Sequence, residues 1–298
     1  MVSSTEVKAV VKEAGADLVG IASVDRFAGA PPMRRPTDLL PGTRSVIVAA
    51  VRYPLEGVRR IGEPPGYALP SIDYAGAICR KLEDIALDVM RWLEDRRASA
   101  LAAPVTWPIG WRVRPYKDMD KPLQAMFSHR HAAVAAGLGV FGKHTLVLTP
   151  EFGPRQRFIS ILTDAALEPD PMYSGAPLCP ESCHACVKAC PLHCIDCRQP
   201  LHLSIGGRDF SYPTLDAMRC AWVEQYRLKQ VDGLELYGIQ YDCDPPANIT
   251  YEDVDRAIKE AMATDKLQYS GPNGMTATLG ECIRTCVKVF EQRRAKPV

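Results

Sequence analysis

The stretch that decides the fold is FSHRHAAVAAGLGVFGKHTLVLTP, residues 127–150. Three glycines, Gly137, Gly139 and Gly142, follow a helix-like run and precede TLVLT, a run typical of a strand. A dinucleotide-binding loop has the opposite order, because its phosphate rests on the N-terminus of the helix that follows. Nucleotide binding is therefore disfavoured. Two interpretations stay open: a tight turn after a glycine-capped helix, or a backbone surface that lies close to a large cofactor.

The rest of the first half alternates helix and strand patterns. One amphipathic stripe, over residues 73–97, places its apolar side chains on a single helical face. We expect Cys79, on the flank of this stripe, to be a core residue. The predicted helices are 4–15, 73–97 and 127–136, and the predicted strands are 17–24, 44–53, 145–149 and 157–164.

The bulk composition excludes several classes of protein. The 298 residues are 47% apolar and carry a formal net charge of +1, which argues against nucleic-acid binding by bulk electrostatics. No run approaches the roughly 18 apolar residues of a membrane helix. Residues 1–20 carry charges throughout and lack the apolar region of a signal peptide. We therefore expect a cytoplasmic protein that does not enter a membrane.

Cysteine is the unusual component, with eleven residues of which ten lie in the second half. Crowded cysteines in a cytosolic chain bind metal more often than they form disulfides. The run CPESCHACVKACP, residues 179–191, matches the ferredoxin pattern C-x2-C-x2-C-x3-C-P, except that its first interval is one residue longer. This spacing favours an iron–sulfur cluster over the two alternatives, a zinc site or free thiols.

A second cluster would need cysteines from farther along the chain. In the ferredoxin pattern the fourth cysteine serves the other cluster, so the assignment crosses between the two motifs. The first predicted cluster takes Cys179, Cys183, Cys186 and Cys286. The second takes Cys190, Cys220, Cys282 and Cys243. Cys194 and Cys197 are left over; they could replace Cys243 or Cys179, form a redox-active pair, or have no role in either cluster.

Several stretches together resemble the epoxyqueuosine reductase-like iron–sulfur proteins, which are relatives of the reductive dehalogenases. These stretches are residues 15–24, 40–54 and 128–170 with the cysteine run that follows, and the most specific is AGLGVFGKHTL, residues 136–146. The resemblance implies an α+β fold. It would comprise a nitroreductase-like, cobalamin-binding α/β core over 1–177 and a ferredoxin-like two-cluster domain over 178–298, with an insert at about 198–279.

The resemblance also implies cofactors and site residues. Two [4Fe–4S] clusters would feed electrons to a base-off cobalamin. The corrinoid would be lined by Gly137, Gly139, Gly142, Lys143 and Thr145. A proton donor is expected just before the glycine turn, and the candidates are Tyr116, Asp120 and His129. Each has an ordinary alternative: a buried aromatic, a helix cap and a helix-surface residue, respectively.

The predicted function is that of a cobalamin-dependent iron–sulfur reductase acting on a small-molecule substrate, with a low-potential electron donor such as ferredoxin or flavodoxin. The alternatives are an electron-transfer or corrinoid-activating protein without substrate chemistry, and a cobalamin carrier or sensor. We do not expect the tRNA-modifying enzyme itself, because the tRNA-modifying reductases carry a helical extension after their last cysteines. The insert would either cover the cofactor face or form a homodimer contact.

Overall fold

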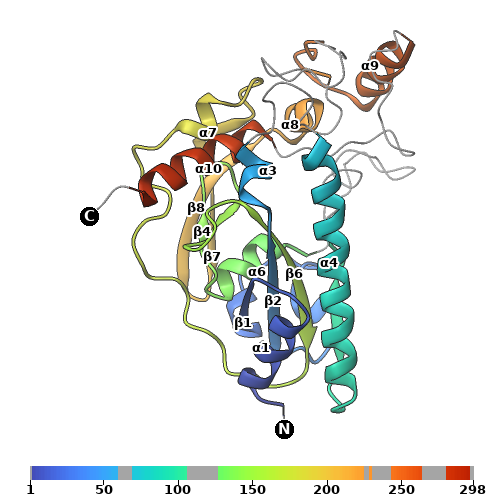
Figure 1. Cartoon of the computed structure of the whole chain (residues 1–298), viewed down its shortest axis with the longest axis vertical. Coiled ribbons are helices and arrows are strands. Elements are labelled where there is room, and N and C mark those ends of the chain that lie inside the picture. The colour runs from blue at the N-terminus through green and yellow to red at the C-terminus, as the bar shows by residue number, and fades with distance from the viewer. Residues whose placement is uncertain are drawn as a thin grey trace.

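The computed structural model, shown in Figure 1, describes residues 2–59, 69–105, 127–224, 228–229, 243–263 and 280–295. Its helices are α1 (Ser4–Glu13), the 3-10 helix η1 (Val24–Phe27), α2 (Pro36–Leu39), α3 (Leu55–Arg59), α4 (Leu69–Glu94), α6 (His129–Ala135), α7 (Ala185–Lys188), α8 (Ala217–Glu224), α9 (Tyr251–Ala263) and α10 (Glu281–Arg294). Its strands are β1 (Leu18–Ser23), β2 (Ser45–Arg52), β3 (Ala100–Ala103), β4 (Val140–Phe141), β5 (Val147–Leu148), β6 (Gln156–Thr163), β7 (Ile195–Ile205) and β8 (Arg208–Leu215). The helices and strands predicted in the first half are confirmed, with their ends shifted.

The first half is built on a four-stranded sheet with the order β1–β2–β6–β3. Each neighbouring pair of strands is antiparallel. In the central strand β2, every residue from Ser45 to Ala50 is buried. A strand covered on both faces reads as a continuous apolar run rather than an alternating one, which is the pattern of SVIVAAV. The mixed helix-and-sheet fold is as predicted.

Helices cover both faces of this sheet (Figure 1). On one face, Ile47 of β2 and Ile161 of β6 pack with α1 and α4 in one apolar cluster. On the other face, Val48 and Leu162 pack with α6 in a second cluster. The alternation of neighbouring side chains between the two clusters follows from the two-residue repeat of a strand.

Helix α4 carries the apolar stripe predicted from its sequence. Ile78, Leu82, Ile85, Val89 and Leu93 are all buried in the cluster shared with the sheet. Burial of each such side chain contributes roughly 1.5–3 kcal/mol. Cys79 lies in the same core, as predicted. None of the helices in the described ranges has the length and apolar character needed to cross a bilayer.

The glycine stretch begins where α6 ends, and Gly137 forms part of the cap of that helix. Gly137 has φ +76, and its backbone N–H donates to the Val134 carbonyl at 3.1 Å. The next N–H, of Leu138, donates to the Ala133 carbonyl at 2.9 Å. These two bonds form a Schellman cap, in which glycine is favoured because the cap residue is left-handed. Strands β4 and β5 then form a short hairpin.

The second half holds elements that the sequence patterns did not reveal. Strands β7 and β8 form a long antiparallel hairpin, closed by Gly206 and Gly207 at positive φ. Helix α9 forms most of the stretch YEDVDRAIKEAMATD, residues 251–265. Helix α10 then returns beside α7 and α3 (Figure 1), where Ile283 and Val287 join the core cluster of α4. The last described helix therefore packs on the first part of the chain.

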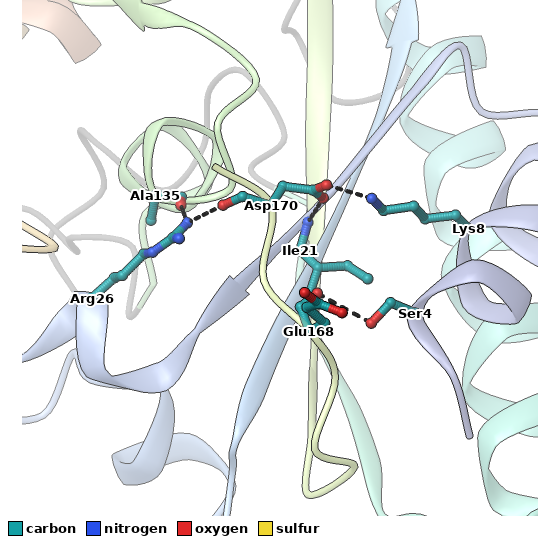
Figure 2. Close-up of polar contacts among 7 residues, drawn as sticks. All are labelled: Ser4, Lys8, Ile21, Arg26, Ala135, Glu168 and Asp170. Atoms are coloured by element: carbon teal, nitrogen blue, oxygen red, sulfur yellow. Dashed lines mark hydrogen bonds and ion pairs between the residues drawn. The ribbon is translucent and has the colours of Figure 1, made fainter. Parts of the chain in front are cut away.

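The segment around Asp170, which follows β6, bonds to β1, α1 and the end of α6, as Figure 2 shows. The Asp170 carboxylate accepts the backbone N–H of Ile21 at 2.8 Å and pairs with Lys8 of α1. Its own backbone N–H donates to the Ile21 carbonyl at 2.8 Å. Arg26 donates to the carbonyls of Asp170 and Ala135, at 2.7 and 2.5 Å. The segment is thus held to β1, α1 and the end of α6 at once.

Candidate functional site

Four cysteines from distant parts of the chain line one small hollow. Cys179 and Cys183 come from the loop before α7, Cys186 from α7 itself, and Cys286 from α10. The structure therefore brings together the four cysteines that the sequence assigned to the first cluster. The other lining residues are His144, Leu148, Leu178, Ala185, Val289, Phe290 and Arg293.

The thiols of this hollow influence one another. Burial raises the pKa of Cys186 to about 12, and the nearby Cys179 and Cys183 add to the rise. Burial likewise raises the pKa of Cys286, with the other three thiols contributing. Burial also opposes ionisation of Cys183, but the Ala185 N–H and the Arg293 guanidinium lower its pKa overall. A bound cationic centre would favour the thiolate forms of Cys186 and Cys286, whose ionisation burial opposes.

Lys143 fastens the cysteine loop to the glycine stretch. Its ammonium group donates to the backbone carbonyls of Pro180 and Glu181, at 3.1 and 2.7 Å. The Pro180 carbonyl also accepts the N–H of Cys183 at 3.0 Å. Lys143 was predicted to line a corrinoid. In the structure it holds the backbone between two of the cysteines.

His144 lies next to Lys143 and is only 4% exposed. Its Nδ1 accepts the backbone N–H of Leu146 at 3.1 Å. Burial, followed by the charge of Arg130, lowers the pKa of His144 to about 4, so the ring is neutral near pH 7. Within the described part of the chain, its Nε2 has no hydrogen-bond partner. Sequence reasoning missed this residue, since one histidine within a turn gives no signal of its own.

The glycines of the predicted corrinoid surface pack against the chain itself. A Cβ on Gly137 would lie 2.1 Å from the Pro171 carbonyl oxygen, and one on Gly139 would lie 1.9 Å from that of Leu148. A Cβ on Gly142 would lie 2.8 Å from Cε1 of His144. Thr145 is buried at φ +67, and its carbonyl accepts from Arg130. These contacts explain the residues without a cofactor, so their corrinoid role stays a prediction.

A second group of cysteines lies beyond α7. The Cys194 N–H donates to the Cys190 sulfur at 3.3 Å. The hydrogen bond from the Cys194 thiol, added to backbone donors, lowers the pKa of Cys190 to about 6 and raises that of Cys194. Cys220 lies near enough to raise the pKa of Cys194 further. All three, with Cys243, pack in one apolar cluster around Trp222.

This second group differs from the predicted set in one member. Cys190, Cys220 and Cys243 are together, as assigned, and Cys194, which had been left over, joins them. Cys282 contacts the large core cluster of α4 and the sheet. The ligand role of Cys282 stays a prediction. Cys197 lies on β7, beyond Cys194.

The proposed proton donors have different outcomes. Tyr116 and Asp120 lie outside the described residues. His129 is buried, and its Nε2 lies 2.9 Å from the Pro104 carbonyl, which can only accept. Its Nδ1 must then accept from the Ser160 hydroxyl at 2.9 Å. Both nitrogens are engaged, which is the arrangement of a structural histidine, and the role of His129 as a donor stays a prediction.

His131, two residues on, belongs to a buried aromatic group rather than to the helix surface. Its Nε2 lies 3.2 Å from the Tyr212 hydroxyl of β8, and its Nδ1 bonds to Ser128. The rings of Phe141 and Tyr212 pack against each other at 4.7 Å. Burial, with the charge of Arg130, lowers the pKa of His131 to about 4. The group ties the β7–β8 hairpin to α6.

The chemistry of the donor set, four thiols around one hollow, is that of a metal or iron–sulfur site. Within the described ranges, no three His, Cys, Asp or Glu side chains converge as the ligands of one metal ion would. Zinc with four thiolates needs sulfurs at about 2.3 Å from a common centre. Four cysteines line the hollow, and three of them come from the ferredoxin-like run, whose first interval is one residue longer than in ferredoxins; thiolates from such a run are ligands of a cubane of iron and sulfide.

The chain is similar to known proteins over part of its length. No protein-family model matches the chain. The epoxyqueuosine reductase of Gloeobacter violaceus is 33% identical over 181 residues, covering 58% of this chain and 47% of that protein. A tetrachloroethene reductive dehalogenase of Desulfitobacterium hafniense is 42% identical over 64 residues, 21% of this chain and 12% of that protein. The chain spans about half the length of the epoxyqueuosine reductases it matches.

A solved structure gives the fold of a larger share of the chain. The reductive dehalogenase whose structure suggests a mechanism for B12-dependent dehalogenation matches with a TM-score of 0.51 and 15% identity. The match covers 95% of this chain and 37% of that one. At this identity the likeness shows the fold alone. Together with the sequence similarities, it defines a mixed helix-and-sheet protein related to reductases.

Sequence similarity to epoxyqueuosine reductases and, over a shorter stretch, to reductive dehalogenases supports an epoxyqueuosine reductase-like family related to the reductive dehalogenases. The resemblance first noted in residues 136–146 and in the cysteine run is thereby confirmed.

Proposed function

We propose that the chain is an iron–sulfur reductase that carries single electrons through two [4Fe–4S] clusters. The observation that carries this proposal is the hollow lined by Cys179, Cys183, Cys186 and Cys286. Three of these come from one ferredoxin-like run and the fourth from a helix 100 residues later, which is the crossed arrangement of two-cluster ferredoxins.

The second cysteine group supports a path for electrons. Cys186 belongs to the first group and Cys190 to the second, and only three residues separate them. Four residues of fully extended chain span at most about 14 Å, so the two centres would be close neighbours. Substituting Cys194 and Cys282 one at a time would show which of them completes the second centre.

We further propose that the final acceptor is a base-off corrinoid, which would supply one- and two-electron cobalt chemistry when bound. This rests on the relationship to the reductive dehalogenases, one of which is described by its B12-dependent reaction. The nitroreductase-like description of the core and the ferredoxin-like description of the cysteine region belong to the same proposal. Gly137, Gly139, Gly142, Lys143 and Thr145 contact their own chain, so their role in lining the corrinoid stays a prediction. We therefore derive no step through it.

The chain's own residues would protect and orient the first cluster. Phe290, Val289 and Leu148 exclude water from the hollow, while Lys143 holds the loop of Cys179 and Cys183 in place. The substrate would be a small molecule and the electron source a low-potential carrier such as a ferredoxin or flavodoxin. A protein that only transfers electrons or activates a corrinoid would share the clusters but lack substrate turnover.

The test is metal content. Chain prepared under anaerobic conditions should hold about eight irons and eight sulfides from two four-iron clusters. Cys186→Ser should lose about half of the iron, whereas Cys197→Ser, a cysteine outside the first hollow, should keep it. Zinc in place of iron, or colourless protein, would overturn the proposal. Iron without cobalamin binding would leave the electron-carrier function and remove the corrinoid.

A further inference from the structure

We infer that the Nε2–H of His144 donates a hydrogen bond to a sulfur of the first cluster, either a cysteine sulfur or an inorganic sulfide, and thereby raises that cluster's reduction potential. The inference rests on the proposed function, because it requires a cluster in the four-cysteine hollow. It assigns a role to a residue that neither the cysteine pattern nor the predicted corrinoid surface includes. His144 would therefore act through the cluster, by changing its reduction potential.

The tautomer of His144 is set by the backbone. The Leu146 N–H points to Nδ1 at 3.1 Å, so Nδ1 is the acceptor and carries no hydrogen. In a neutral imidazole the other nitrogen, Nε2, must then carry the hydrogen. This donor is buried and has no hydrogen-bond partner among the residues that the structure describes. Such a buried donor costs free energy unless something accepts from it.

The lining of the hollow leaves sulfur as the acceptor. Among the side chains that line it with His144, Arg293 can only donate hydrogen bonds. The other non-cysteine members are apolar: Leu148, Leu178, Ala185, Val289 and Phe290. The acceptors available among the lining side chains are therefore the cysteine sulfurs, which a bound cluster would supplement with sulfides.

The turn between β4 and β5 is built around this ring. The Gly142 N–H donates to the Leu146 carbonyl at 2.8 Å, and the Thr145 N–H donates to the Gly142 carbonyl at 2.9 Å. Thr145 takes a left-handed conformation that a β-branched residue rarely adopts. A Cβ on Gly142 would lie 3.1 Å from Nε2 of His144, so glycine leaves room for the ring. The loop thus presents His144 in one orientation.

A hydrogen bond to a cluster sulfur stabilises the reduced form more than the oxidised form, since the reduced cluster carries the additional negative charge. Hydrogen bonds to the sulfurs and solvent exposure are among the features that set cluster potentials. His144 would therefore make the first cluster easier to reduce than its cysteine ligands alone would.

The experiment is a redox titration of the full chain with both clusters, followed by electron paramagnetic resonance. His144→Phe removes the donor, and His144→Gln places an amide N–H near the former Nε2. At the wild-type midpoint, His144→Phe should lower the reduced-to-oxidised ratio of one cluster about tenfold, which is about 59 mV for one electron. The second cluster should not change, and His144→Gln should restore most of the loss. His202→Phe, an exposed histidine of β7, is the matched control.

An unchanged potential in His144→Phe with both clusters intact would overturn the inference while leaving the proposed function standing. Absence of iron in the wild type would end the proposed function itself. If the His144 variants do not assemble the first cluster, the wild-type protein decides. Labelling its histidines with ¹⁵N should give a nitrogen coupling on the reduced first cluster and a coupled proton that exchanges in D₂O. Absence of both couplings would refute the hydrogen bond.

Discussion

Substituting alanine at Gly137 tests whether this glycine serves the fold of the chain. Gly137 has φ +76, and an added Cβ would lie 2.1 Å from the carbonyl oxygen of Pro171. Gly207, in the β7–β8 turn, has nearly the same φ of +74, but a Cβ there would meet nothing within 4 Å. The pair therefore separates the conformational cost of alanine from the cost of the clash.

The magnitudes follow from the two environments. A left-handed alanine costs roughly 1–2 kcal/mol at either position. At Gly137 the segment of Pro171 must also shift, and it is held by the bonds between Asp170 and Ile21 and by Arg26. Losing two or three such hydrogen bonds costs roughly 2–3 kcal/mol more. We expect Gly137→Ala to destabilise the chain by about 3–5 kcal/mol and Gly207→Ala by about 1–2 kcal/mol.

The assay is denaturant unfolding of both variants, with hydrogen exchange of residues 166–174 as a local measurement. Gly137→Ala should lower the midpoint well below that of Gly207→Ala and should speed exchange in this segment. Equal midpoints would refute the reasoning, because the clash would then cost nothing. If Gly137→Ala were as stable as Gly207→Ala but lost corrinoid binding, the cofactor surface predicted from sequence would be supported instead.

Three further predictions concern the site and its supports. Lys143→Ala removes the bonds to the Pro180 and Glu181 carbonyls, and it should speed iron loss to a chelator severalfold, whereas Lys259→Ala, on the exposed side of α9, should not. Asp170→Ala should destabilise the chain by roughly 1.5–3 kcal/mol, because it removes a charged acceptor from Ile21 and Lys8. An unchanged unfolding midpoint would show that these contacts, drawn in Figure 2, do not stabilise the chain. His131 has a folded pKa of about 4, below its unfolded value near 6.5, so the unfolded chain binds more protons between these values. Its contribution to stability is present above about pH 6.5 and is lost as pH falls toward 4. His131→Gln should therefore weaken the pH dependence of the unfolding midpoint between about pH 4 and 6.5.

Much of the fold is written in local patterns. The apolar stripe of α4 and the continuous apolar run of β2 predict their own burial, because periodicity reports which face of an element meets the core. The cap at Gly137 follows the same logic, since the residue type matches the left-handed position at a helix end. The sequence pattern does not predict the β7–β8 hairpin, because Pro200 and Pro213 interrupt its strands and the register shifts after Asp196.

The cysteine sets show where local patterns stop. The spacing of the run that ends at Cys190 predicts a cluster, and the crossed rule predicts that Cys286 joins it. Whether Cys194 or Cys282 lies beside Cys190 depends on how α8 and α10 pack. That packing is decided by apolar contacts around Trp222 and around Ile283, which spacing does not encode.

The amino-acid sequence by itself determined the secondary structure of the first half and the resemblance to epoxyqueuosine reductase-like proteins, and it predicts sulfur ligation. Only the tertiary structure decided which residues the glycines accommodate and which side chains line the sulfur hollow. Gly139 leaves room for the Leu148 carbonyl of the neighbouring strand, and the Nδ1 of His144 accepts from Leu146 while its Nε2 meets no partner among the described residues. Roles of this kind arise from contacts between side chains and backbone that meet only after the chain has folded, so no spacing along the sequence records them.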